Sequence, residues 1–137
     1  MIVIVCVDDR GGMMFNHRRQ SADKILRDRI LELTAGRKLW MNHYSASQFA
    51  DVENPSLNID DSFLSEAQEG EYCFAEDTAL KPYEQWIEKI ILFKWNRVYP
   101  SDRSFDISLK NGGWKLRSRE DFSGNSHEKI TMEVYER

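Results

Sequence analysis

The sequence predicts an α/β domain, and three features of the chain support this fold class. Met1–Val7 is an uninterrupted apolar run, as expected of a central strand that is buried on both faces. Apolar residues then recur at helical spacing within residues 21–36. Near the C-terminus, residues 114–120 and 127–135 alternate apolar and polar side chains on either side of a polar loop at 122–126. We therefore expect a mixed, mostly parallel sheet that ends in an antiparallel C-terminal hairpin.

The elements follow one another in short segments. Ser21 is a suitable N-cap for the first helix, Leu26 and Ile30 place apolar side chains on one face, and Gly36 ends it. We expect further strands at 38–42, 57–59, 72–75 and 88–95, and short helices at 45–51, 61–67 and 81–86. The second of these helices, at 61–67, would be capped by Asp60 or Asp61.

Composition predicts one domain that covers residues 1–137. Hydrophobic residues make up 41% of the chain and charged residues 31%, and no repeat or long linker divides it. The net charge of −4 makes nucleic acid an unlikely partner class, because such binding needs a basic surface. No apolar run approaches the roughly 20 residues of a membrane span.

The first residues and the cysteines predict a cytoplasmic location. The start MIVIVCV lacks a basic n-region and meets Asp8 and Asp9 at once, so we interpret it as a strand and not as a signal peptide. Cys6 and Cys73 both lie in apolar strand-like runs, and we expect them to be reduced and buried.

Three segments resemble the dihydrofolate reductase family, in the correct order. Residues 32–42 read ELTAGRKLWMN, residues 87–107 read IEKIILFKWNRVYPSDRSFDI, and the C-terminal segment reads WKLRSREDF…EVYER. The resemblance covers most of the chain, although residues 42–72 are fewer than this family uses there. It implies a dihydrofolate reductase-like three-layer sandwich, and it identifies positions at which the family's site residues can be sought.

The first cofactor landmark of that family is changed. The family places a Gly-Gly pair after its central strand, where a helix N-terminus receives the pyrophosphate of the dinucleotide. Glu76 and Asp77 stand there in this chain, and their carboxylates add bulk and repel phosphate. Asp77 and Thr78 would cap a helix at Ala79, or the two acids would contact a cation or a positively charged ligand. We expect no cofactor.

The second cofactor landmark, a Gly-Arg-x-Thr run after the second strand, is also changed. Asn42-His43-Tyr44-Ser45 stands in its place, so the arginine that holds phosphate in the family is missing. Ser45 keeps a hydroxyl group, and we include His43 and Ser45 among the candidate ligand-binding residues. The ordinary interpretation of His43 is a surface polar residue.

The catalytic positions implied by the resemblance are apolar. The family's carboxylate in the first helix corresponds to Leu26, and its threonine on the sixth strand corresponds to Phe93. Asp23 is the nearest candidate for a substitute acid, although an acidic residue there also stabilises a helix N-terminus. Loss of both groups would remove proton delivery to the substrate.

The loop at residues 11–21, GGMMFNHRRQS, has a composition of its own. His17, Arg18 and Arg19 form a local basic patch, and arginines suit phosphate or carboxylate recognition. The alternative is that the arginines are solvated or paired with nearby acids. This loop is our first candidate for function.

Metal-dependent hydrolysis has no support in the residues. The three histidines, His17, His43 and His127, have no metal-ligand spacing, so we expect no metal site. A metal-independent ribonuclease or phosphodiesterase would use His17 with one of the other two as acid and base, and Arg18 or Arg19 to hold phosphate.

Taken together, these residues predict a small dihydrofolate reductase-like protein that is not an NADPH-dependent reductase. We expect a small anionic or nucleotide-like ligand, or a partner, to bind in the residual cleft at Arg18, Arg19, His43, Ser45, Glu76 and Asp77. The alternatives are a divergent NADPH-dependent reductase that uses Asp23, and the nuclease that uses His17.

Overall fold

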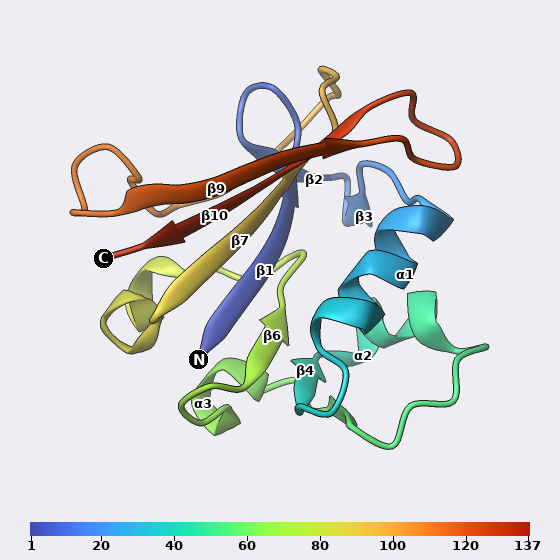
Figure 1. The fold of residues 1–137 in the computed structure, drawn as a ribbon, viewed down its shortest axis with the longest axis vertical. Helices are drawn as coiled ribbons and strands as arrows, with labels where there is room; N and C mark the ends of the chain where they lie inside the picture. The colour runs from blue at the N-terminus through green and yellow to red at the C-terminus, as the bar shows by residue number, and fades with distance from the viewer.

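A seven-stranded sheet crosses the centre of this computed structural model, which describes residues 1–137 (Figure 1). In spatial order the strands are β5 (Leu57–Ile59), β4 (Leu39–Met41), β6 (Tyr72–Phe74), β1 (Ile2–Val7), β7 (Lys89–Lys94), β10 (Ile130–Glu136) and β9 (Lys115–Phe122). All neighbouring strands from β5 to β7 are parallel, while β10 is antiparallel to both β7 and β9. The predicted mixed sheet with an antiparallel C-terminal hairpin is confirmed.

Helical segments cover both faces of the sheet and make three layers. They are α1 (Lys24–Leu33), α2 (His43–Ala46), α3 (Phe63–Glu66) and the 3-10 helices η1 (Ser47–Phe49) and η2 (Lys81–Trp86). Leu26 and Ile30 of α1 share a buried cluster with Ile4 of β1. Phe63 of α3 belongs to a second cluster with Val5. No helix is long and apolar enough to cross a membrane.

Strand β1 separates the two clusters because its side chains alternate between the faces of the sheet. Ile2 and Ile4 join one cluster, and Val3 and Val5 join the other.

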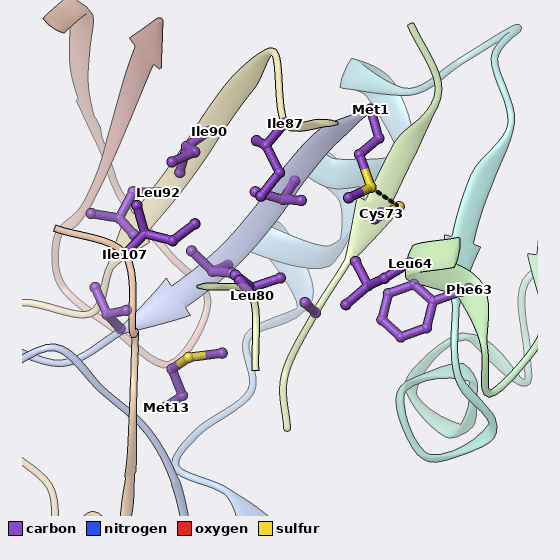
Figure 2. Close-up of a cluster of buried hydrophobic side chains, with 14 of the residues drawn as sticks. Met1, Met13, Phe63, Leu64, Cys73, Leu80, Ile87, Ile90, Leu92 and Ile107 are labelled. Atoms are coloured by element: carbon purple, nitrogen blue, oxygen red, sulfur yellow. Dashed lines mark hydrogen bonds between the residues drawn. The ribbon is translucent and has the colours of Figure 1, made fainter. Parts of the chain in front are cut away.

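Figure 2 shows the second cluster, in which the Cys73 sulfur lies 3.7 Å from the sulfur of Met1. Burial raises the pKa of the Cys73 thiol to about 12. Both cysteines are free thiols; Cys73 is buried as predicted, whereas Cys6 is only half-buried.

A small second sheet lies beside the end of β1. It contains β3 (Arg18–Arg19), β2 (Gly12–Phe15) and β8 (Arg103–Ser104), in that spatial order. The turn between β2 and β3 places Asn16 and His17 at positive φ of 52° and 60°. Two consecutive residues with positive φ are typical of a type I′ hairpin turn. The basic loop of the sequence is therefore an ordered hairpin that holds His17 at its tip.

The first helix begins later than the sequence suggests. Asp23, and not Ser21, is its N-cap, and the Asp23 carboxylate accepts hydrogen bonds from the N–H groups of Ile25 at 2.9 Å and Leu26 at 3.3 Å. The Ser21 hydroxyl instead lies 2.9 Å from a ring nitrogen of His127. The Ser21 side chain, which local sequence assigned to the helix cap, therefore contacts a residue from a distant part of the chain instead.

The predicted cap at Asp77 and Thr78 is also wrong. No helix begins at Ala79, and η2 begins at Lys81. The carboxylate of Asp106 accepts hydrogen bonds from the N–H groups of Leu80 and Lys81, each at 3.0 Å. A residue from a distant loop therefore satisfies the backbone donors that open η2.

The other two short helices differ slightly from their predicted ranges. Asn42 caps α2 by accepting from the Ser45 N–H at 2.9 Å, so this helix starts at His43. Asp60 accepts from the Ser62 N–H at 2.7 Å, one turn before α3, and the α3 N-cap itself makes no side-chain bond.

Candidate functional site

Polar side chains gather at the carboxyl edge of the parallel strands, the edge at which α/β sheets bind ligands. Asp8 follows β1, Asn42 follows β4, and Glu76 lies just beyond β6. Asp8 and Glu76 are buried, with 2% and 8% of their surface exposed. Buried charges of this kind need partners.

Glu76 finds its main partner in Arg19. The Arg19 guanidinium donates from Nε to one carboxylate oxygen at 2.9 Å and from Nη2 to the other at 3.2 Å. Gln48 donates a third hydrogen bond to Glu76 at 2.8 Å. Arg19 also lies 4.5 Å above the Tyr44 ring, and its backbone N–H donates to the Tyr44 hydroxyl at 2.7 Å. This two-point ion pair ties the β2–β3 hairpin to the end of β6.

The electrostatics of the pair keep Arg19 charged. Burial works to lower the pKa of Arg19, but the hydrogen bond and charge of Glu76 outweigh it, so the pKa is raised. The sequence analysis assigned Arg19 to an anion and Glu76 to a cation or a positively charged ligand. In the structure the two side chains neutralise each other.

The remaining predicted ligand residues occupy separate environments. Asp77 accepts from the Asn42 side chain at 2.8 Å. His43 is exposed and lies 3.0 Å from Asp61. Ser45 is fully buried, and its hydroxyl has no hydrogen-bond partner in the protein. The structure therefore does not gather these residues into one cluster with Arg18.

Two hollows flank the hairpin. One of about 330 Å³ is lined by Phe15, Asn16, Arg18, Arg19, Gln20, Tyr99 and Pro100. The other, of about 390 Å³, is lined by Met14, His17, Asp77, Asp102 and Arg103. His17 and Arg18 thus face different spaces although they are adjacent. Neither Arg18 nor Arg103 makes an ion pair.

The largest hollow lies elsewhere. It measures about 710 Å³ and is lined in part by Met1, Leu64, Tyr83 and Trp86, at the amino ends of the strands. None of the predicted site residues reaches it. We place the candidate functional site at the carboxyl edge of the strands, because the buried carboxylates of Asp8 and Glu76 lie there.

A second polar network joins residues that the sequence did not connect. His127 Nδ1 lies 3.0 Å from Asp23 Oδ2, and His127 Nε2 lies 2.9 Å from Ser21 Oγ. The Tyr99 hydroxyl lies 3.1 Å from the same Nε2. His127 and Asp23 are each only 5% exposed. The ring of Trp95 stacks on His127 with the centroids 4.5 Å apart.

Asp23 is held as a carboxylate by this network. Burial works to raise the pKa of Asp23, but hydrogen bonds from the Asn125 N–H, from His127 and from the Ser126 N–H lower it well below the usual range. The Asn125 and Ser126 bonds measure 2.9 and 2.8 Å. Together with the two cap bonds from α1, they occupy both carboxylate oxygens.

The two positions at which the resemblance placed catalytic groups are packed as apolar core. Leu26 is 4% exposed and Phe93 is fully buried, and both belong to the cluster beneath α1. Phe93 also makes an edge-to-face contact with Phe122. No cluster of His, Cys, Asp or Glu residues is able to hold a metal ion.

Sequence reasoning named His127 only as one of three histidines and treated Ser21 as a cap. Nothing local links them to Asp23, because His127 is 104 residues further along the chain. The one available signal was that His127 lies in the loop just before the last strand and that polar residues precede α1.

Comparison with known proteins supports the fold. No protein-family model matches the chain, and no curated protein sequence matches it. Among solved structures, dihydrofolate reductase from Enterococcus faecalis, complexed with NADP(H) and RAB-propyl, superposes with a TM-score of 0.72. The match covers 99% of this chain and 95% of that one, at 11% sequence identity. This protein therefore has the dihydrofolate reductase-like fold.

Proposed function

We propose that this protein binds a small anionic, nucleotide-like ligand in the 330 Å³ hollow beside the β2–β3 hairpin, and that it is not an NADPH-dependent reductase. The observation that carries the proposal is the unpaired guanidinium of Arg18 in a hollow that also contains exposed aromatic surface. A volume of about 330 Å³ lies at the lower end of the range of small-molecule sites, roughly 300–1,000 Å³.

The lining of this hollow suits a nucleotide in two ways. Arg18 supplies a free fork of donors for phosphate, and Phe15, 47% exposed, supplies a face for stacking a base. Tyr99, which comes from a distant segment of the chain, adds a second aromatic ring to the lining of the same hollow. Arg19 lines the same hollow, but its charge is already matched by Glu76.

Three features support the absence of reductase activity. Glu76 stands where the resemblance calls for a glycine, and it is engaged by Arg19. Asp23 keeps a lowered pKa, whereas a proton donor needs a pKa near the working pH. Its carboxylate also has no oxygen left to hold a substrate, because both accept hydrogen bonds within the chain.

The nuclease alternative has no observation of this strength. His17 lines the other hollow, His43 pairs with Asp61 at the surface, and His127 is buried against Asp23. The three histidines thus occupy three separate environments.

Binding is tested by titrating the protein with adenosine and guanosine monophosphates, inorganic phosphate and NADPH, and by following the heat of binding. We expect saturable binding of a mononucleotide and none of NADPH at micromolar concentration. Arg18→Ala should weaken mononucleotide binding about tenfold or more, because a charge-assisted bond to phosphate is lost.

Arg117→Ala is the matched control, since Arg117 is an exposed arginine on β9 with only a 3.9 Å contact to Glu136. It should leave the affinity unchanged. Micromolar NADPH binding, or equal affinity for a mononucleotide in the wild type and in Arg18→Ala, would refute the proposal.

A further inference from the structure

We propose that Ser21 as nucleophile, His127 as general base and Asp23 as the carboxylate that orients the base cleave small carboxylic esters through an acyl-serine intermediate. This activity does not depend on the proposed binding of an anion by Arg18, and its test is independent of that one. The inference rests on the positions of three side chains that come from two distant parts of the chain (residues 21–23 and residue 127).

The distances fit the proposed roles. Ser21 Oγ lies 2.9 Å from His127 Nε2, and His127 Nδ1 lies 3.0 Å from Asp23 Oδ2. Both separations are within the range of about 2.6–3.2 Å that links a nucleophile to its base and the base to its orienting group. Because the Asp23 carboxylate can only accept, it selects the tautomer with the proton on Nδ1. Nε2 then carries the lone pair, with the hydroxyls of Ser21 at 2.9 Å and Tyr99 at 3.1 Å.

The base is held in place by its surroundings. Trp95 stacks on the imidazole at an interplanar angle of 28°, which prevents the ring from turning away. The N–H groups of Asn125 and Ser126 fix the Asp23 carboxylate. A positioned base of this kind needs no reorganisation when it takes a proton.

Ser21 lies beside a hollow and is followed by free backbone donors. Ser21 is half-buried, and its neighbour Gln20 lines the 330 Å³ hollow together with Tyr99. The Tyr99 hydroxyl reaches His127 Nε2 at 3.1 Å from that side. The backbone N–H groups of Ala22 and Asp23, which follow Ser21, donate to no acceptor in the protein. The N–H after a nucleophilic serine is a usual donor to the oxyanion.

The chemistry balances with water as the only co-reactant. Ser21 Oγ adds to the ester carbonyl carbon while its proton moves to His127 Nε2. The carbon–oxygen bond to the alcohol breaks, and the alcohol leaves with that proton. Water then adds to the acyl-Ser21 carbonyl and gives a proton to Nε2, and the acid leaves as Ser21 regains the proton.

The first test uses a fluorophosphonate probe with mass spectrometry of the labelled peptide, and hydrolysis of p-nitrophenyl acetate. We expect the label on Ser21 and a hydrolysis rate above that of buffer. Ser21→Ala should abolish both while the melting temperature stays close to that of the wild type, because only one side-chain hydrogen bond is lost. Ser123→Ala, an exposed serine in the loop before His127, should leave both unchanged.

Asp23 acts through His127 and is therefore a positioning residue. Asp23→Asn should lower kcat by about 10²-fold or more with KM little changed, as expected when the base is held in the wrong tautomer. An unlabelled Ser21 in the folded wild type would overturn the proposal. Ester hydrolysis that survives Ser21→Ala would do the same, and the three residues would then serve only to anchor the loop before β10 to the start of α1.

Discussion

Arg18 and Arg19 are adjacent in sequence and line the same hollow, but only Arg19 has a charged partner. Arg19 is drawn into the structure by Glu76 and stacks on Tyr44, with 23% of its side chain exposed. Arg18 is exposed and makes no ion pair. The difference comes from the partners within reach, because Glu76 and the Tyr44 ring lie against the Arg19 guanidinium. One arginine is therefore structural and its neighbour is free for a ligand.

Arg19→Ala should lower the free energy of unfolding by about 2–4 kcal/mol, because it leaves the buried Glu76 carboxylate with only Gln48 as a side-chain donor. Arg18→Ala should lower it by less than about 0.5 kcal/mol, as for an exposed surface residue. Chemical denaturation of both variants measures the difference. Equal losses would show that the Arg19–Glu76 pair contributes no net stability.

At the scale of elements, two helices are anchored by side chains from distant parts of the chain. Asp106 caps η2 from the loop after β8. Asp23 caps α1 and also accepts from the N–H groups of Asn125 and Ser126 before β10. The Asp106 carboxylate thus accepts hydrogen bonds from the first N–H groups of η2. The Asp23 carboxylate accepts from the first turn of α1 and also from the loop before β10. Short helices need such support, because isolated helices of this length are unstable.

Asp106→Ala should lower the free energy of unfolding by about 1–2 kcal/mol, since two backbone donors of η2 lose their acceptor. Thr78→Ala is the matched control, because the sequence placed the cap there and the structure gives Thr78 only a 3.3 Å bond to Asp77. Thermal unfolding compares the two. A larger loss in Thr78→Ala than in Asp106→Ala would contradict the observed capping.

For the whole molecule, the distribution of carboxylates determines how stability responds to acid. Several carboxylates have a lowered pKa because hydrogen bonds and nearby cations stabilise the charged form; they are Asp8, Asp23, Asp61, Glu71, Glu84, Glu88 and Asp121. In the folded state they bind protons less readily than in the unfolded chain. Their stabilising contribution is therefore present above the unfolded pKa and disappears as the pH falls.

We expect the free energy of unfolding to be insensitive to pH near neutrality from these groups and to fall below about pH 4.5, where unfolded carboxylates take up protons. Asp23→Asn should flatten the most acidic part of this profile, because the folded pKa of Asp23 is the lowest of the set. Urea denaturation at a series of pH values measures it. Stability that rises on acidification from pH 5 to pH 3 would contradict the assignment.

Much of the architecture could be predicted from local patterns. The apolar run of β1 and the alternation in β10 identify which faces of each strand are buried, and these patterns depend only on residues close in sequence. Leu26 and Phe93 are apolar, so the sequence also predicted that the carboxylate and the threonine expected from the resemblance are absent at these positions. Helix starts were less accurate, because Ser21 and Asp77 both have suitable side chains that tertiary partners claimed instead.

The candidate site divides along the same line. The sequence by itself determined which faces of the main strands are buried, the apolar core and the presence of a basic segment at 11–21, because these follow from short-range periodicity and residue type. The hairpin and the small second sheet that this segment forms were not predicted. Only the tertiary structure decided which polar groups meet. Arg19 reaches Glu76 across 57 residues, and Asp23 reaches His127 across 104. Such pairs leave no periodic trace in the sequence, since burial enforces them only after the sheet has brought its distant strands together.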